Sequence, residues 1–210
     1  MSRLINEEIA QMEETIRTYK DTVQTACYEQ FKNASTLTQS NNFRGAAADA
    51  YKSYVNTATI NLLNSLINAA EDMATTMTGV KEAFLGFESD EAGRVDTDTL
   101  SEVMTQLSEK STAFGSLAGE IDATLSSAGE YIAVTSLSSD TVTSGMTTVS
   151  NDVQQVGFDL ESTNSQVLSQ AEALLSTLER LGTAIDKTSG DYHVDGTINY
   201  DKMGGMTSES

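Results

Sequence analysis

The chain has 210 residues and a formal net charge of −19, with one cysteine, one histidine and no proline. This charge should repel nucleic acids and anionic membrane surfaces, so a basic partner or surface is the more natural expectation, although a solvated acidic face is the simpler interpretation. The single Cys27 excludes an intramolecular disulfide and a cysteine-rich metal site.

The absence of proline and the spacing of the apolar residues predict long helices. About 5% of residues in an average protein are proline, which would give roughly ten in a chain of this length. Along most of the sequence, apolar residues recur at alternating steps of four and three. A stripe of this period is typical of helices that pack lengthwise against other helices.

The first helix is predicted from about Leu4 to Thr38, and Cys27 should be buried in it. Residues 39–42 are polar and Phe43, Arg44 and Gly45 follow, so the chain can reverse its direction here. The apolar stripe of this helix consists of Ile5, Ile9, Met12, Ile16, Tyr19, Val23 and Ala26.

The second helix is predicted from Ala46 to about Phe87, which makes an antiparallel hairpin with the first. Such a hairpin would be roughly 50 to 60 Å long at 1.5 Å per residue. Its stripe consists of Ala47, Tyr51, Tyr54, Ala58, Leu62, Leu66, Ala69, Met73, Met77, Val80 and Phe84.

Residues 88–98 form an acidic boundary, in which Asp96 or Asp98 can cap the next helix. The third helix is predicted from Leu100 to Ile132, and a break at residues 136–141 precedes a fourth helix that reaches Ile185. The third stripe is Leu100, Met104, Leu107, Ser111, Phe114, Ala118, Ile121, Leu125, Ala128 and Ile132; the fourth is Val142, Met146, Val149, Val153, Val156, Leu160, Thr163, Val167, Leu174, Leu181 and Ile185.

Five glycines interrupt these two helices, where each costs about 1 kcal/mol relative to alanine. They either let another helix approach closely, mark a bend or simply weaken the helix. These glycines are Gly115, Gly119, Gly129, Gly145 and Gly157.

The fold class is therefore all-α, an elongated assembly of long antiparallel, coiled-coil-like helical hairpins. We expect a partner-binding hairpin at 1–87, an acidic loop at 88–98, a second long hairpin at 99–188 and a flexible linker or tail at 189–210. The N-terminal segment carries acids and no apolar core, and no apolar run approaches the ~20 residues of a membrane span, so no signal peptide or membrane helix is expected.

No catalytic set is recognisable, so the sequence predicts a non-enzymatic protein without a cofactor. His193 has no nucleophile setting around it, and neither a phosphate-binding loop nor a zinc-spaced cluster occurs. Residues 191–202 partly match a calcium loop, but Lys202 stands where a bidentate Glu should close the shell and His193 replaces an oxygen ligand. A turn-rich linker is the favoured interpretation of this segment.

Two segments resemble the LXG domain, the N-terminal targeting region of polymorphic toxins exported by the type VII (type VIIb) secretion systems of Gram-positive bacteria. Residues 42–51, NFRGAAADAY, resemble the family's turn and the Ala/Tyr start of its second helix, with Phe43 in the leucine position. Residues 87–100 resemble its central segment. The chain is too long for a small WXG-type hairpin protein and too short to carry an added toxin domain. The resemblance thus implies a targeting domain cut from a longer toxin, or a toxin-free member.

The resemblance implies a WXG-type first hairpin that pairs with small helical-hairpin targeting or chaperone proteins and presents the toxin to the secretion apparatus for interbacterial competition. The protein would be cytoplasmic before export and then secreted without a classical leader. Candidate partner-binding residues are Ile5, Ile9, Met12, Ile16, Tyr54, Leu62 and Leu66. Phe84 with Glu88, and Phe87 with Glu91, fit an aromatic-x-x-x-acid export signal.

Three alternatives remain open from the sequence. Any single apolar residue of the stripes is more often internal core than interface. The chain could also be a self-associating structural rod of the filament or adhesin type. A pore-forming helical toxin is disfavoured by the charge and by the lack of a long apolar run.

Overall fold

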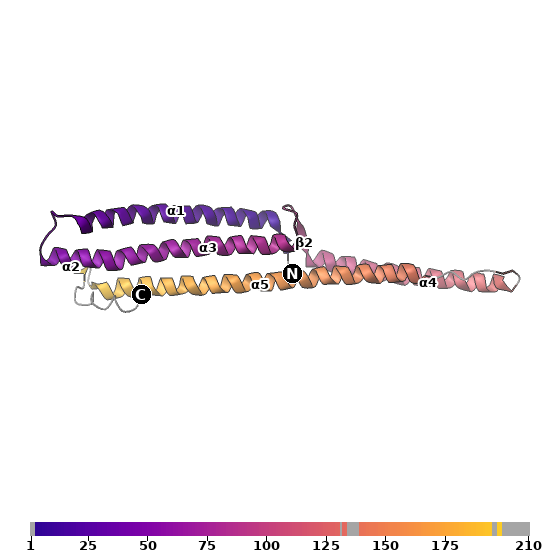
Figure 1. Cartoon of the computed structure of the whole chain (residues 1–210). Coiled ribbons are helices and arrows are strands. Elements are labelled where there is room, and N and C mark those ends of the chain that lie inside the picture. Colours follow the sequence, from indigo (N-terminus) through magenta and orange to yellow (C-terminus); the bar gives the residue numbers. More distant parts are fainter. Residues whose placement is uncertain (1–2, 131, 134–138, 195–196, 199–210) are drawn as a thin grey trace. The chain divides into compact units, whose positions relative to one another are not determined.

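The computed structural model describes residues 3–130, 132–133, 139–194 and 197–198 and confirms an all-α fold built from long helices (Figure 1). The elements in chain order are β1 (Arg3–Ile5), α1 (Asn6–Gln39), α2 (Ala46–Tyr54), the π-helical turn η1 (Val55–Thr59), α3 (Ile60–Phe87), β2 (Arg94–Asp96), α4 (Thr97–Gly129), α5 (Asp140–Tyr192), β3 (His193–Val194) and β4 (Thr197–Ile198). None of the described helices is long and apolar enough to cross a membrane.

The chain forms two compact units. One unit holds the chain up to Asn6 together with residues 84–166, and the other holds residues 7–83 and the chain from Val167 onwards. The division into domains at residues 88–98 stays a prediction, since the compact units group the chain by packing and α5 contributes to both of them.

Helices α1 and α3 lie side by side as an antiparallel hairpin (Figure 1), as the sequence predicts. The Glu13 carboxylate accepts hydrogen bonds from Lys81 at 2.7 Å and Thr78 at 3.1 Å. Further along α1, the Gln24 amide donates to the Glu71 carboxylate at 2.8 Å. The residue numbers of the partners on α3 thus decrease as those on α1 increase, so the two helices run in opposite directions.

The chain reverses between α1 and α2 at the predicted turn. Gly45 has a φ of +109°, a conformation that side chains with a Cβ rarely adopt. The Lys52 ammonium donates to the Ser40 carbonyl at 2.6 Å and ties the turn to α2. The predicted second helix is present but includes η1, whose wider turn buries Val55 and Ala58.

The second half of α5 joins this hairpin. A Cβ placed at Gly79 of α3 would lie 3.6 Å from the Gln170 Oε1 of α5, so the Gln170 side chain reaches α3 there. Buried side chains of the unit include Cys27 of α1 and Leu63, Ala69, Ala70 and Met77 of α3. The second half of α5 adds half-buried residues such as Leu174 and Leu181.

The other unit begins with a short antiparallel ladder in which β1 pairs with β2, Leu4 opposite Val95. The prediction that the first helix begins at Leu4 is therefore wrong by two residues. The reason is long-range: the Asn6 side-chain amide donates to the carbonyls of Glu88 at 2.8 Å and Asp90 at 2.7 Å. The Asn6 backbone N–H also donates to the Gly93 carbonyl at 3.1 Å.

The acidic loop between α3 and α4 is compact around Gly93. This residue is buried, and a Cβ in its place would lie 2.7 Å from the Asp90 carbonyl oxygen. Of the two predicted caps it is Asp96 that acts, because its carboxylate accepts from the N–H groups of Asp98 at 2.8 Å and Thr99 at 3.4 Å.

Helix α4 and the first half of α5 form the second hairpin. Ile132, predicted as the last stripe residue of the third helix, lies beyond the end of α4 and is 63% exposed. Helix α5 begins at Asp140 and continues to Tyr192, past the predicted Ile185. Of the predicted break at residues 136–141, residues 136–138 lie outside the described residues, and Asp140 and Thr141 already belong to α5. Leu160 is fully buried and Leu4 is 2% exposed, so both belong to the core of this unit.

The glycines of this hairpin show no close approach of another helix. A Cβ placed at Gly115, Gly119, Gly145 or Gly157 would meet no atom within 4 Å. Gly129 is the last residue of α4. At the first four positions the close-packing interpretation is therefore wrong.

Candidate partner-binding surfaces

The predicted partner-binding residues differ widely in exposure. Ile5 is buried in β1. Ile9 and Ile16 on α1 are half-buried, whereas Met12 between them is 56% exposed. Tyr54, Leu62 and Leu66 are half-buried. The binding of a partner by these residues stays a prediction. Their exposure shows that Met12 is accessible on the surface, whereas Ile5 is buried.

An exposed apolar stripe runs along one edge of α1. Met12, Tyr19 and Ala26 are each seven residues apart and all are exposed, Tyr19 by 53%. Between them, the hydroxyls of Thr15 and Thr22 donate to carbonyls one turn earlier, at 2.8 and 2.9 Å. Since these hydroxyls are satisfied within the helix, the edge offers few polar groups that need water.

Matching stripes continue on α3 and on the second half of α5. Leu66 and Met73 are half-buried on α3, seven residues apart. Leu168 and Leu175 on α5 are 59% and 56% exposed and are also seven residues apart. The seven-residue spacing places the members of each stripe on one side of their own helix. We define the long-helix apolar face as Met12, Tyr19, Leu66, Met73, Leu168 and Leu175.

The α5 part of this face was missed by the sequence analysis. The predicted stripe of the fourth helix includes Leu174 and Leu181, which are half-buried. Leu168, Ala171, Leu175 and Leu178 form a second stripe with steps of three, four and three beside it. Two parallel stripes on one helix were the signal that could have indicated two packing surfaces.

The opposite side of the α1–α3 hairpin is polar. A shallow groove of about 620 Å³ is lined there by Glu13, Arg17, Lys20, Glu71, Ala74, Thr75, Thr78, Gly79 and Glu82. The hydrogen bond from Lys81 holds the pKa of the Glu13 carboxyl below its ordinary value, with smaller help from Thr78 and Arg17, and this outweighs the effect of burial. The hairpin therefore has one charged side and one apolar side.

The residues of the family turn motif lie on the surface. Phe43, Arg44 and Gly45 are all exposed, and the Arg44 guanidinium donates to the Asn41 carbonyl. The Phe43 ring makes an edge-to-face contact with Tyr51, with ring centroids 6.1 Å apart. Phe43 therefore occupies the leucine position as an aromatic anchor for the start of α2.

The two candidate export signals differ in accessibility. Phe84 is buried at 8% exposure and Glu88 is half-buried. Phe87 is half-buried and Glu91 is exposed. A receptor could therefore reach the second pair more readily than the first.

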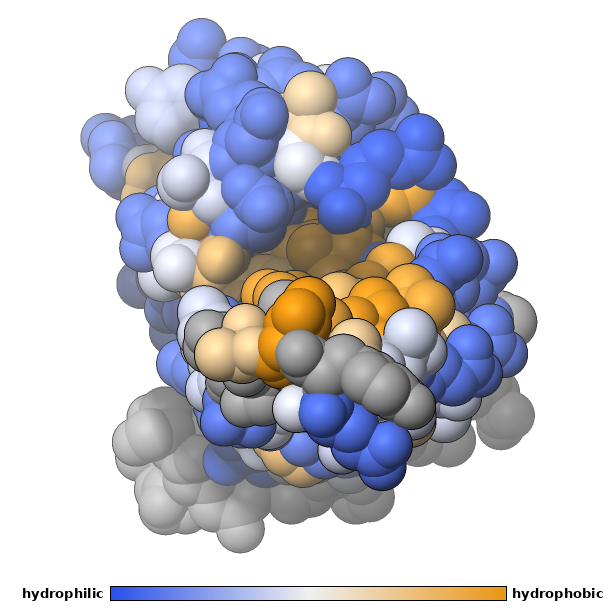
Figure 2. All heavy atoms as spheres, turned by 90° about the vertical axis from the view of Figure 1, so that its right-hand side faces the viewer, coloured by the Kyte–Doolittle hydropathy of each residue, from blue (hydrophilic) through white to orange (hydrophobic). Residues whose placement is uncertain are grey.

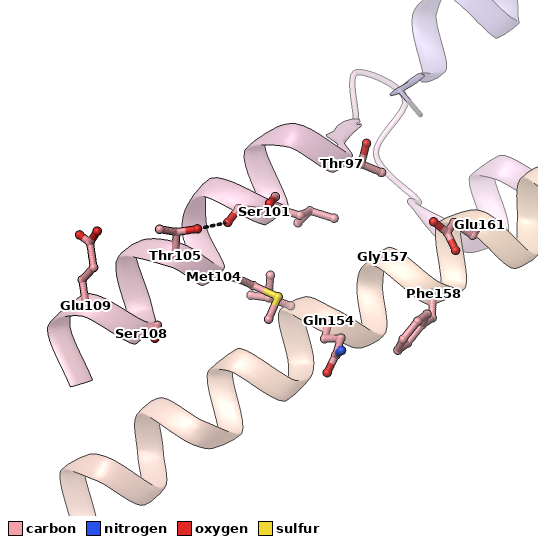
Figure 3. A pocket seen from close by; sticks show the side chains of 12 residues that line it. Thr97, Ser101, Met104, Thr105, Ser108, Glu109, Gln154, Gly157, Phe158 and Glu161 are labelled. Atoms are coloured by element: carbon pink, nitrogen blue, oxygen red, sulfur yellow. Dashed lines mark hydrogen bonds between the residues drawn. The ribbon is translucent and has the colours of Figure 1, made fainter. Parts of the chain in front are cut away.

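The α4–α5 hairpin carries an open groove of about 580 Å³ on one side (Figure 3). Met104 of α4 lies between the two helices, whereas the Phe158 ring points away from α4. Phe158 is 55% exposed. The groove is lined by Thr97, Leu100, Ser101, Met104, Thr105, Ser108, Glu109, Val153, Gln154, Gly157, Phe158 and Glu161. Its small hydroxyl side chains and Gly157 explain why the two helices leave space there.

No metal-binding cluster of His, Cys, Asp and Glu residues occurs among the described residues. Of the predicted calcium-like segment, His193–Val194 pairs with Thr197–Ile198 as a short antiparallel ladder. Residues 195–196 and 199–202 of this segment lie outside the described residues.

The fold and its surfaces define a helical-hairpin protein whose prominent surface features are apolar stripes rather than a polar catalytic cleft. The sequence matches the family described as LXG domain of WXG superfamily over residues 3–194, and the chain belongs to this family. It is thereby related to the N-terminal domains of type VII secretion toxins, which serve export and targeting rather than catalysis. A search of curated proteins found no match.

Proposed function

We propose that the chain is the export-targeting domain of a type VII-secreted toxin and that a small helical-hairpin protein binds its long-helix apolar face. Family membership supports the connection with secretion. The observation that carries the choice of surface is the pair of heptad-spaced, half-exposed stripes, Met12 with Tyr19 on α1 and Leu168 with Leu175 on α5.

The exposed side chains of this face can act as anchors for a partner. A buried tyrosine contributes about 150 to 250 Å², so the exposed half of Tyr19 represents about 100 Å². At about 25 cal/mol per Å² of apolar area its burial contributes at most about 2.5 kcal/mol, from which the costs of ordering the interface are subtracted. Four such side chains around the half-buried Leu66 and Met73 offer an anchor cluster of the kind that dominates interfaces.

The proposal assigns different roles to the predicted residues. Met12 and Leu66 contact the partner directly, while Ile9, Ile16, Tyr54 and Leu62 hold the helices that present them, and Ile5 belongs to the core of the other unit. Phe87 with Glu91 is the proposed export signal, read by the secretion apparatus. The assembly acts in the cytoplasm before export and is then secreted, in competition between Gram-positive bacteria.

A self-associating rod is the second candidate, because heptad-spaced stripes also pair with copies of themselves. The net charge of −19 opposes it, since two copies would bring like charges together along their whole length. A partner of different sequence has no such penalty.

Two tyrosines of α1 allow a matched test. Tyr19 is 53% exposed and Tyr28 is 64% exposed, and their separation of nine residues places them on opposite sides of the helix. The chain would be co-expressed with the small helical-hairpin proteins encoded beside it. Complexes would be measured by size exclusion with light scattering and by titration. Tyr19→Glu should weaken the complex at least tenfold, and Tyr28→Glu should leave it unchanged.

Two outcomes would overturn the proposal. One is a stable homo-oligomer of the wild-type chain whose mass does not depend on concentration, which would favour the rod. The other is equal weakening by Tyr19→Glu and Tyr28→Glu, which would place the partner elsewhere. Circular dichroism of both variants checks that their helices remain intact.

A further inference from the structure

Three valines of α5 remain uncovered although they lie in its predicted stripe. Val142, Val149 and Val156 are 41%, 47% and 36% exposed. The alternate members of the same stripe lie deeper: Met146 and Val153 are half-buried and Leu160 is fully buried. Helix α4 therefore covers one edge of the stripe and leaves a second edge, with one valine every seven residues, in solvent.

Helix α4 contributes to the same side of the hairpin. Val103, Leu117 and Ile121 are 38%, 54% and 38% exposed. The period of the two antiparallel helices places these three residues beside the valines and away from the groove that Ser101, Thr105 and Phe158 line. We define the valine face as Val103, Leu117, Ile121, Val142, Val149 and Val156.

Figure 2 looks along the helices from the end at which α4 leads into α5; hydrophobic residues gather on part of the surface that faces the viewer, and hydrophilic residues cover most of the rest. The seven-residue spacing of Val142, Val149 and Val156 places them on one edge of α5. With 1.5 Å per residue, the three valines of α5 alone span about 21 Å, the length of a helix of about 14 residues.

The charges around the valine face select its occupant. Asp152 and Asp159 each follow a valine by three residues on α5, and Glu102 and Glu120 lie beside the strip on α4. Residues 97–166 contain ten acidic residues and a single basic one, Lys110, which lies near the middle of the strip. Gln106 donates to Glu102 and Gln155 to Asp159, but these neutral amides leave both negative charges in place.

We infer that the valine face binds an amphipathic helix of another protein whose apolar stripe is flanked by lysine or arginine. The apolar strip supplies a coiled-coil seam, and the flanking acids occupy positions that pair with basic residues across such a seam. A second copy of this chain fits poorly, because it would bring its own Glu102, Glu120, Asp152 and Asp159 to the interface. The surface lies in the unit that holds residues 84–166, so this partner is distinct from the one proposed for the long-helix apolar face.

The probe for this proposal is a 21-residue helical peptide with leucines at heptad a and d positions and lysines beside them, labelled for fluorescence anisotropy against the full chain. A peptide of the same composition with scrambled order controls for non-specific attraction to a protein of this charge. The double variant Val149→Asn, Val156→Asn should weaken binding at least tenfold, since it removes two apolar contacts without changing the charge. Phe158→Asn, an exposed apolar residue on the opposite side of α5, should leave the affinity unchanged.

Charge reversal gives a second, independent readout. Asp152→Lys with Asp159→Lys should weaken the lysine peptide and improve binding of the same peptide with glutamates in place of lysines. The inference is overturned if the scrambled peptide binds equally well or if the valine variants bind like the wild type. A dimer of the wild-type chain that the valine variants dissociate would also overturn it, because the occupant would then be a second copy.

The two proposals fail separately. Tyr19→Glu should leave peptide binding unchanged, and the valine double variant should leave binding of the small helical-hairpin partner unchanged. If Tyr19→Glu alone abolishes binding of the lysine peptide, the peptide occupies the long-helix apolar face and the inference about the valine face is wrong.

Discussion

Replacing Asn6 by alanine removes the two hydrogen bonds that its side-chain amide donates to the carbonyls of Glu88 and Asp90, at 2.8 and 2.7 Å. Asn6 is 4% exposed, so water does not readily replace the lost donor. Each net hydrogen bond contributes about 0.5 to 1.5 kcal/mol. The Asp90 carbonyl keeps the hydrogen bond from the Gly93 N–H at 2.8 Å, so it is not left without a donor. We therefore expect the Asn6→Ala variant to lose about 1 to 3 kcal/mol of stability.

The assay is urea denaturation followed by far-ultraviolet circular dichroism, combined with amide hydrogen exchange. The free energy of unfolding should fall by that amount. The exchange rate of the Val95 amide, in the strand paired with Leu4, should rise relative to the wild type by more than the rates of amides in the middle of α4. Asn6→Asp should be at least as destabilising, because it replaces the donating amide by an oxygen that faces two carbonyls. Asn33→Ala, at an exposed position on α1, is the matched control and should change stability by less than about 0.5 kcal/mol.

A loss of less than about 1 kcal/mol for Asn6→Ala, or unchanged exchange at Val95, would refute this reasoning. It would mean that the loop between α3 and α4 is held by the strand pairing of β1 with β2 and by burial of Leu4 rather than by the asparagine. The Asn6 Oδ1 is buried without a hydrogen-bond partner, which is why the calculation rests on the donating nitrogen alone.

Three further predictions concern single side chains. Glu13→Gln should cost about 0.2 to 1 kcal/mol of stability at pH 7. Because the pKa of Glu13 in the folded protein is lowered from its ordinary 4.5, this loss should be complete above pH 4.5 and should vanish as the pH falls below that value. Urea titrations at several pH values measure the loss, and a loss that does not depend on pH would contradict the prediction. Asp96→Ala removes the cap of α4 and should cost about 0.5 to 2 kcal/mol, with Asp98→Ala as the milder control in thermal unfolding. Leu160→Ala empties the fully buried site on α5 and should cost about 2 to 5 kcal/mol in urea, whereas an equal effect of Val149→Ala would contradict the assigned burial.

Much of the secondary structure could be predicted because its signals are local. The four-three spacing placed α1, α3, α4 and α5 within a few residues of their ends, apart from the extension of α5. Gly45 indicated the turn because glycine readily adopts a positive φ, and this preference belongs to the single residue and needs no distant contact. Asp96 was one of two predicted caps because capping depends on the next three residues.

The candidate sites were less predictable because they depend on residues far apart in the sequence. Nothing local distinguishes Leu4 and Ile5 from a first helical turn; their strand conformation comes from pairing with residues 94–96. Phe84 fits the spacing of an export signal, yet it is buried. Leu168 and Leu175 were overlooked because the stripe beside them has the same period.

By itself the sequence determined that the protein is all-α, that the chain turns at Gly45, and that it belongs to the LXG family. These features follow from helical period, from local turn residues and from recognisable motifs. Only the tertiary structure decided which edge of each stripe is covered. An apolar stripe with a period of 3.5 residues is wider than the area that one neighbouring helix covers, so that helix can pack on either edge of the stripe. The position of α4 alone leaves Val142, Val149 and Val156 in solvent while Leu160 is buried.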